Sequence, residues 1–119
     1  MLTARDIYER VSAHLLTQRA VSEDDNGSCR LRSSDGRKCA IGSLIADDVY
    51  RPDIEGVGIS YYRNARDGSL LRALYASEVN AYDPEIAELL IELEEVHDDF
   101  SVDEWPQLLA RLAERHAFV

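Results

Sequence analysis

Cysteine, histidine and aspartate side chains at a few positions of this chain could carry out chemistry. Cys39 directly precedes a predicted short helix and follows Arg37 and Lys38, so the helix dipole and these positive charges would lower the pKa of its thiol. A thiolate of this kind is a nucleophile, and His97 could serve as its general base. Asp98 is not expected to orient the ring of His97, because adjacent helical positions point about 100° apart. One hypothesis is therefore a cysteine-dependent enzyme that uses Cys39 with His97.

The two cysteines also have structural interpretations. Nine residues separate Cys29 from Cys39, which does not match the close cysteine pairs of zinc ribbons and knuckles. The three histidines, His14, His97 and His116, would have to converge from three helices, so we expect neither a metal nor a cofactor. A disulfide is not favoured in a reducing compartment. Because free cysteine is among the most buried residue types, both sulfurs are expected to pack between a hairpin and the short helix behind it.

Acidic residues are concentrated in one region of the sequence. The chain has a net charge of −10, and residues 73–110 contain eleven acids and no lysine or arginine. Five acids recur at intervals of three and four on one side of a predicted helix, opposite its leucines. This acidic ridge consists of Glu85, Glu88, Glu92, Glu95 and Asp99. Like charges at this spacing cost roughly a few tenths of a kcal/mol per pair, so the ridge slightly destabilises the helix that carries it.

Two interpretations of the acidic ridge remain open. It is either an ordinary solvated face of an acidic protein, which a basic cluster could neutralise by folding against it, or a surface that docks on a basic partner. The basic cluster consists of Arg30, Arg32, Arg37 and Lys38. A negative field repels phosphate backbones and attracts basic surfaces. We therefore expect a basic protein surface as the partner, such as a host nucleic-acid-binding protein, and no direct binding of nucleic acid.

Helix signals define the elements that must position these residues. Thr3, Asp83 and Ser101 are predicted helix N-caps, and Glu104 completes a capping box with Ser101. Apolar residues recur with helical spacing after each cap and again between the caps. The expected helices cover residues 3 to about 19, 40–46, 69–79 with Tyr75 facing inward, 83 to about 99, and from 103 onward.

A β-hairpin is predicted over residues 29–39. Its turn contains Asp35 and Gly36, which are favourable turn residues. A two-residue turn at these positions would place Arg32 opposite Cys39. The predicted fold class is mostly α, with four to five helices and one short β-hairpin, in a single α+β domain over residues 1–119.

Length and composition restrict the class of protein. A chain of 119 residues that is 45% hydrophobic can bury a core without disulfides. Within the predicted short helix, Gly42 is expected to permit the close approach of another element. No apolar run is long enough to cross a membrane. The first residues lack the apolar core and cleavage site of a signal peptide, which predicts a cytoplasmic location. Tyr61 and Tyr62 could contribute to self-association.

The segment from Cys29 to Gly56 resembles a small family of uncharacterised proteins from bacteriophages and bacterial genomes. The resemblance rests on a Gly-x-x-Cys-Ala-x-Gly-x-Leu-Ile stretch, an acid-x-Tyr, a Glu-Gly and a later His-Asp segment, EEVHDDF. The matching positions are Cys29, Gly36, Cys39, Ala40, Gly42, Leu44, Ile45, Asp48, Tyr50, Glu55 and Gly56. The resemblance implies a phage or prophage origin and no particular chemistry.

The leading hypothesis combines the charge distribution with this resemblance. It describes a small, non-enzymatic, acidic phage-type protein whose acidic ridge engages a basic host protein that handles nucleic acid or acts in defence. The alternative remains a cysteine-dependent enzyme with Cys39 and His97.

Overall fold

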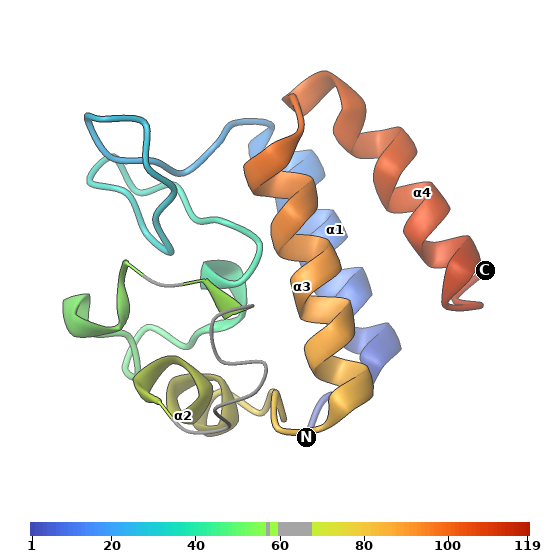
Figure 1. Ribbon diagram of the computed structural model, residues 1–119, viewed down its shortest axis with the longest axis horizontal. Helices are drawn as coiled ribbons and strands as arrows, with labels where there is room; N and C mark the ends of the chain where they lie inside the picture. The colour runs from blue at the N-terminus through green and yellow to red at the C-terminus, as the bar shows by residue number, and fades with distance from the viewer. Residues whose placement is uncertain (57, 60–67) are drawn as a thin grey trace.

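Three helices pack side by side in the computed structural model, which describes residues 1–56, 58–59 and 68–119 (Figure 1). α1 (Ala4–Gln18) and α3 (Pro84–Asp99) run in the same direction, and α4 (Trp105–Arg115) returns along them. Their apolar faces meet in a common core, because each helix carries buried aliphatic residues at helical spacing. The prediction of a mostly helical chain is confirmed.

The remaining elements are short and lie on the other side of α3 from α4 (Figure 1). They are α2 (Ser69–Ala76) and the 3₁₀ turns η1 (Gly42–Leu44) and η2 (Pro52–Ile54). Leu44, Ile54 and Leu74 are buried and extend the core of the three-helix half. Within the described residues, no helix combines the length and the apolar character needed to cross a membrane.

The predicted helix caps are confirmed. Thr3 and Asp6 form a reciprocal capping box at the start of α1, and the Asp83 side chain accepts two amides at the start of α3. Ser101 and Glu104 also form the predicted capping box, but they enclose a 3₁₀ turn, η4 (Val102–Glu104). α4 begins only at Trp105, which places the ring of Pro106 in its first turn, where no amide donor is needed.

The helix predicted over residues 69–79 is too long. α2 ends at Ala76, since Glu78 adopts a φ of 70° and the Val79 amide donates to the Leu74 carbonyl over 2.9 Å. This is a Schellman motif, which terminates a helix by satisfying its last carbonyls. The helix predicted over residues 40–46 is likewise reduced to the single turn η1.

The helical pattern predicted the burial of Tyr75 incorrectly. Tyr75, predicted to face inward, is 50% exposed and makes an edge-on contact with Tyr82, with 6.0 Å between the ring centroids. Tyr61 and Tyr62, proposed for self-association, lie outside the described residues.

The predicted β-hairpin does not form: the described part of the chain contains no strand and two isolated antiparallel bridges, Glu23–Cys29 and Arg32–Lys38. Inside the second pair, the Ser33 amide donates to the Arg37 carbonyl over 2.9 Å, so the turn between these two residues has three residues instead of two. The Gly36 amide donates to the Ser33 carbonyl over 3.1 Å, and Gly36 adopts a φ of 89°. The extra residue places Arg32 opposite Lys38, so the predicted register with Cys39 is wrong.

Side chains replace the backbone acceptors that a strand would need. The amides of Leu31 and Arg32 donate to the Glu55 carboxylate, and the amide of Lys38 donates to the side chain of Gln18. A backbone donor satisfied in this way no longer needs a partner strand. The loop is therefore ordered by distant polar side chains and not by a ladder.

Candidate functional site

Four residues of the acidic ridge are exposed and one is partly buried. Glu85, Glu88, Glu95 and Asp99 are exposed on α3, whereas Glu92 is partly covered by the end of α4. Its carboxylate lies 2.6 Å from Arg115 Nη2 and 2.8 Å from His116 Nε2. Glu92 therefore connects α3 with the C-terminal residues.

The basic cluster does not neutralise the ridge. Arg30 pairs with Glu55, Arg32 and Lys38 pair with Asp47, and Arg37 pairs with Asp35. All of these carboxylates lie outside the ridge. Among the described residues, the ion pairs of this cluster therefore do not supply the counter-charge of the ridge, and the ridge is an acidic face whether or not a partner binds it.

We expect Glu92→Gln to weaken the fold in a pH-dependent way. Burial alone would raise the pKa of Glu92, but the hydrogen bonds from Arg115 and His116 outweigh it and hold the pKa below its usual 4.5. A lowered pKa stabilises the folded state above the unfolded value, and this contribution is lost as the pH falls through the folded pKa. Urea denaturation should show a loss of about 1 kcal/mol at neutral pH, because solvent screens this half-exposed pair.

The same substitution should have a smaller effect in acid. Once the wild-type carboxylate is protonated, the denaturation curves of the wild type and of Glu92→Gln should converge. Glu95→Gln, one turn further along the exposed face of α3, is the matched control and should show no such pH-dependent difference. A gap that persists unchanged in acid would contradict this role of Glu92.

Cys39 is not an activated nucleophile. Its side chain is buried beside η1, and its sulfur accepts a hydrogen bond from the Gly42 amide over 3.2 Å. Burial raises the pKa of this thiol to about 12, so the lowered pKa expected from the sequence is wrong. The physical reason is that removal of the sulfur from water outweighs the amides of a single 3₁₀ turn.

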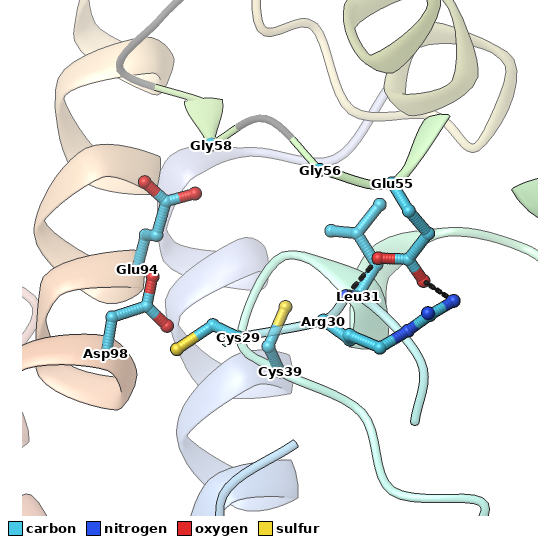
Figure 2. Close-up of a pocket in the computed structure, with 9 residues that line it drawn as sticks. All are labelled: Cys29, Arg30, Leu31, Cys39, Glu55, Gly56, Gly58, Glu94 and Asp98. Atoms are coloured by element: carbon cyan, nitrogen blue, oxygen red, sulfur yellow. Dashed lines mark hydrogen bonds and ion pairs between the residues drawn. The ribbon is translucent and has the colours of Figure 1, made fainter. Parts of the chain in front are cut away.

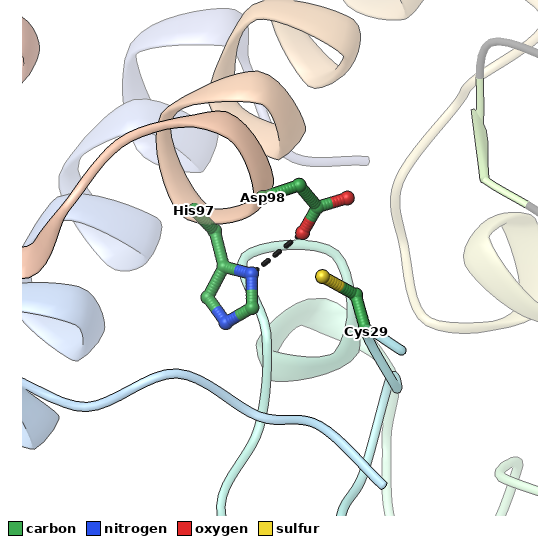
Figure 3. Close-up of side chains that lie close together, drawn as sticks. All are labelled: Cys29, His97 and Asp98. Carbon is green, nitrogen blue, oxygen red and sulfur yellow. Dashed lines mark hydrogen bonds and ion pairs between the residues drawn. The ribbon is translucent and has the colours of Figure 1, made fainter. Parts of the chain in front are cut away.

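Both ring nitrogens of His97 form hydrogen bonds. Nε2 accepts the Ser22 amide over 2.9 Å, and Nδ1 lies 2.6 Å from Asp98 Oδ1 (Figure 3). Since the amide can only donate, Nε2 carries no proton, and Nδ1 therefore donates to Asp98. The expectation that Asp98 could not reach its neighbour's ring is wrong: at the last turn of α3 both side chains bend toward the same loop.

Cys29, and not Cys39, joins His97 and Asp98. The donor atoms of these three residues lie within 4.8 Å of one another, and the Cys29 sulfur points toward the carboxylate (Figure 3). Partial burial and a hydrogen bond to Asp98 raise the pKa of the Cys29 thiol to about 12. Cys29 is therefore also a neutral thiol at physiological pH. Both cysteines are free.

Both sulfurs line one pocket of about 140 Å³ (Figure 2). Its walls come from four separate parts of the chain: the loop around Cys29, the segment before η1, the residues that follow η2, and the last turns of α3. Three carboxylates border the pocket, from Glu55, Glu94 and Asp98. The sequence pattern did not identify Glu94 or Glu55 as site residues, although Glu55 belongs to the Glu-Gly pair of the resemblance.

Glu55 and Glu94 hold loops in place. The carboxylate of Glu55 accepts two backbone amides and the hydroxyl of Tyr50, the latter over 2.6 Å. Glu94 accepts the amide of Ile59 over 2.9 Å, and the absence of a side chain at Gly58 makes room for this carboxylate. These two residues therefore shape the pocket from opposite sides.

Comparisons with known proteins do not add a relative. No family model, no curated protein and no solved structure matches the chain.

Proposed function

We propose that this protein is a non-enzymatic, phage-type binding protein that acts in the cytoplasm, where the exposed part of its acidic ridge engages a basic host protein. The partner class is a protein that handles nucleic acid or acts in host defence. Occupation of its nucleic-acid groove would block its normal ligand. The resemblance to phage proteins and the charge distribution support this class of partner.

The observation that carries the proposal is that acidic side chains of the exposed ridge form no ion pairs within the described residues. Glu85, Glu95 and Asp99 are exposed and form no ion pair with any residue that the structure describes. The fold places its basic cluster against other carboxylates, so the negative field of α3 is directed to solvent. Such a field attracts a cationic surface over several ångströms and accelerates encounter with it.

The geometry does not favour the alternative enzyme. Cys39 is a buried neutral thiol, and His97 has no free nitrogen with which to accept a proton. A general base must reach the proton that it removes. The acidic ridge is therefore the better candidate for function.

Neutralising the ridge should abolish capture of the partner. The test variant is Glu85→Gln, Glu95→Gln and Asp99→Asn, which leaves Glu92 and its structural contacts intact. Tagged wild-type protein should retain nucleic-acid-binding proteins from a host lysate at low salt, and duplex DNA should displace them. Retention by the variant should fall by about tenfold or more, because three charges at the contact are lost.

The matched control removes three charges elsewhere. Asp25→Asn, Asp48→Asn and Asp53→Asn change exposed acids outside α3 and give the same net charge as the test variant. This control should retain the partner as the wild type does. Equal retention by the test variant and the wild type, or equal loss from both variants, would refute a specific role of the ridge.

A further inference from the structure

Two turns of the same geometry follow each other in the chain between α1 and η1. In the first turn, the backbone of Asp24 accepts the Gly27 amide over 3.0 Å and donates to the Ser28 carbonyl over 2.8 Å. Residues 33–37 repeat both hydrogen bonds nine positions later, over 3.1 and 2.9 Å. Each turn is therefore closed by its own backbone hydrogen bonds.

A cavity of about 410 Å³ is lined by both turns, which lie side by side at the end of the molecule far from α4 (Figure 1). This volume is in the range of roughly 300–1,000 Å³ that small-molecule sites occupy. The lining includes Asp24 and Asp25 from the first turn, Ser34 from the second, and Arg30, Arg32 and Tyr50. The cavity thus contains side chains of both charges.

The carboxylates of the first turn have no counter-charge among the residues that the structure describes. Oδ1 of Asp24 accepts the amides of Asn26 and Ser28 over 2.9 and 3.0 Å, which fixes this side chain. Within the same residues, Oδ2 of Asp24 accepts no hydrogen bond, and neither Asp24 nor Asp25 forms an ion pair. This part of the wall therefore attracts a cationic group.

Arg30 supplies donors for an anionic group. Its Nε donates to the Arg32 carbonyl over 3.1 Å, and its Nη2 lies 3.5 Å from the Glu55 carboxylate. The Tyr50 hydroxyl is a third partner. A guanidinium group has more N–H donors than these three partners can accept, so Arg30 is held in place and still has donors for a ligand.

Arg32 and Tyr50 form a fixed part of the wall. The guanidinium of Arg32 lies 4.5 Å from the centroid of the Tyr50 ring, and its Nη2 lies 2.8 Å from both the Ile45 carbonyl and the Asp47 carboxylate. The positive charge of Arg32 is thus used within the protein. Arg30 is therefore the cation that a ligand meets.

We propose that the cavity between the two turns binds a small zwitterion of the α-amino-acid class. Asp24 and Asp25 hold its ammonium group, and Arg30 holds its carboxylate with the help of the Ser34 hydroxyl. A zwitterion pairs with both charged groups at once, whereas a simple cation or anion leaves one of them without a partner. No residue of the acidic ridge lines the cavity, so this site is independent of the proposed binding function.

L-alanine, ethylamine and propionate form a matched set of probes. Ethylamine lacks only the carboxylate of alanine, and propionate lacks only its ammonium group. In NMR titrations of the ¹⁵N-labelled, full-length protein at constant ionic strength, L-alanine should shift the amide resonances of residues 24–34 with a dissociation constant of about 10 mM or lower.

The two single-charge probes should bind about tenfold or more weakly than L-alanine, because each leaves polar groups of the cavity unpaired. Absence of saturable shifts with L-alanine up to about 100 mM would overturn the proposal. Equal affinity for all three probes would overturn it as well.

Two variants assign the charged groups. Asp24→Asn combined with Asp25→Asn removes the negative charge but keeps a side-chain oxygen for the two amides, so the turn should be preserved. Its affinity for L-alanine should fall by about tenfold or more, while propionate should bind no more weakly than to the wild type. Arg30→Gln should show the opposite pattern, with L-alanine weakened and ethylamine unchanged or stronger. Damage to the fold would instead weaken every probe.

The matched control neutralises two exposed acids outside the cavity. Asp48→Asn combined with Asp53→Asn changes the net charge equally and should bind L-alanine as the wild type does. The ridge variant should also bind L-alanine, which separates this site from capture of a protein partner. Wild-type affinity for L-alanine in the Asp24→Asn, Asp25→Asn variant or in Arg30→Gln would refute the assigned contacts.

Discussion

Replacing Gly42 with alanine should destabilise the protein by about 4 kcal/mol or more, a large fraction of the roughly 5–15 kcal/mol that keeps a domain of this size folded. A Cβ atom at this position would lie 2.0 Å from the carbonyl oxygen of Leu31 and 2.7 Å from its carbonyl carbon. These are backbone atoms, which cannot move aside as a flexible side chain can. Leu31 is held further by Glu55, which accepts its amide, and by the amide of Cys39, which donates to its carbonyl.

The matched control is Gly36→Ala. A Cβ at Gly36 meets no atom within 4 Å, but its φ of 89° is unfavourable for alanine. The expected loss is about 1 kcal/mol, measured by urea denaturation of both variants. If Gly42→Ala were no less stable than Gly36→Ala, the close contact between η1 and the Leu31 backbone would have to be abandoned.

Removal of the Glu55 carboxylate should cost about 3 kcal/mol, which is the second largest expected loss of stability. Its side chain is 10% exposed and serves four donors: the amides of Leu31 and Arg32, the hydroxyl of Tyr50 and the guanidinium of Arg30. Glu55→Ala leaves these donors without an acceptor in a place that water reaches poorly. Unpaired donors of this kind are costly, whereas an exposed acid costs little to remove.

Glu55→Gln and Asp53→Ala separate the causes of this loss. The glutamine retains one acceptor oxygen, so its loss should be about half that of alanine, and Asp53→Ala, an exposed neighbour, should be nearly neutral. Denaturation measures the free energies, and hydrogen exchange at the Leu31 and Arg32 amides locates the effect. Unchanged exchange at these two amides in Glu55→Ala would contradict the proposed role.

The helices of this protein are predictable because their signals are local. Thr3 with Asp6, Asp83 before Pro84, and Ser101 with Glu104 each specify a helix start within four residues. Local signals did not locate the end of α2, because a left-handed residue such as Glu78 has no marker in the sequence when glycine is absent.

The loops between α1 and α2 could not be predicted in the same way. The acceptor of the Leu31 amide is 24 residues away, and the residue that accepts the Lys38 amide is 20 residues away. A carboxylate at Glu55 carries no sign of which amide it will meet. The predicted hairpin was wrong for this reason, although its turn residues were correctly recognised.

In the candidate sites, too, the local features were predictable and the contacts between distant segments were not. Helical spacing placed Glu85, Glu95 and Asp99 together on one exposed face, but it could not show that Glu92 would meet the end of α4. The approach of Cys29 to Asp98 joins a loop to a helix 69 positions later, and only the tertiary fold determines it. Burial of Cys39 similarly depends on elements distant from its own turn.

Trp105 makes the region around Asp98 optically visible. It is the single tryptophan of the chain, and its ring stacks on the imidazole of His97 with 5.6 Å between the centroids. All indole fluorescence of this protein therefore originates from one buried position, in contact with the ring that holds the Asp98 carboxylate. Rearrangement of that carboxylate would change the emission of the unlabelled molecule, so events in the sulfur-lined pocket can be followed in real time without an attached dye.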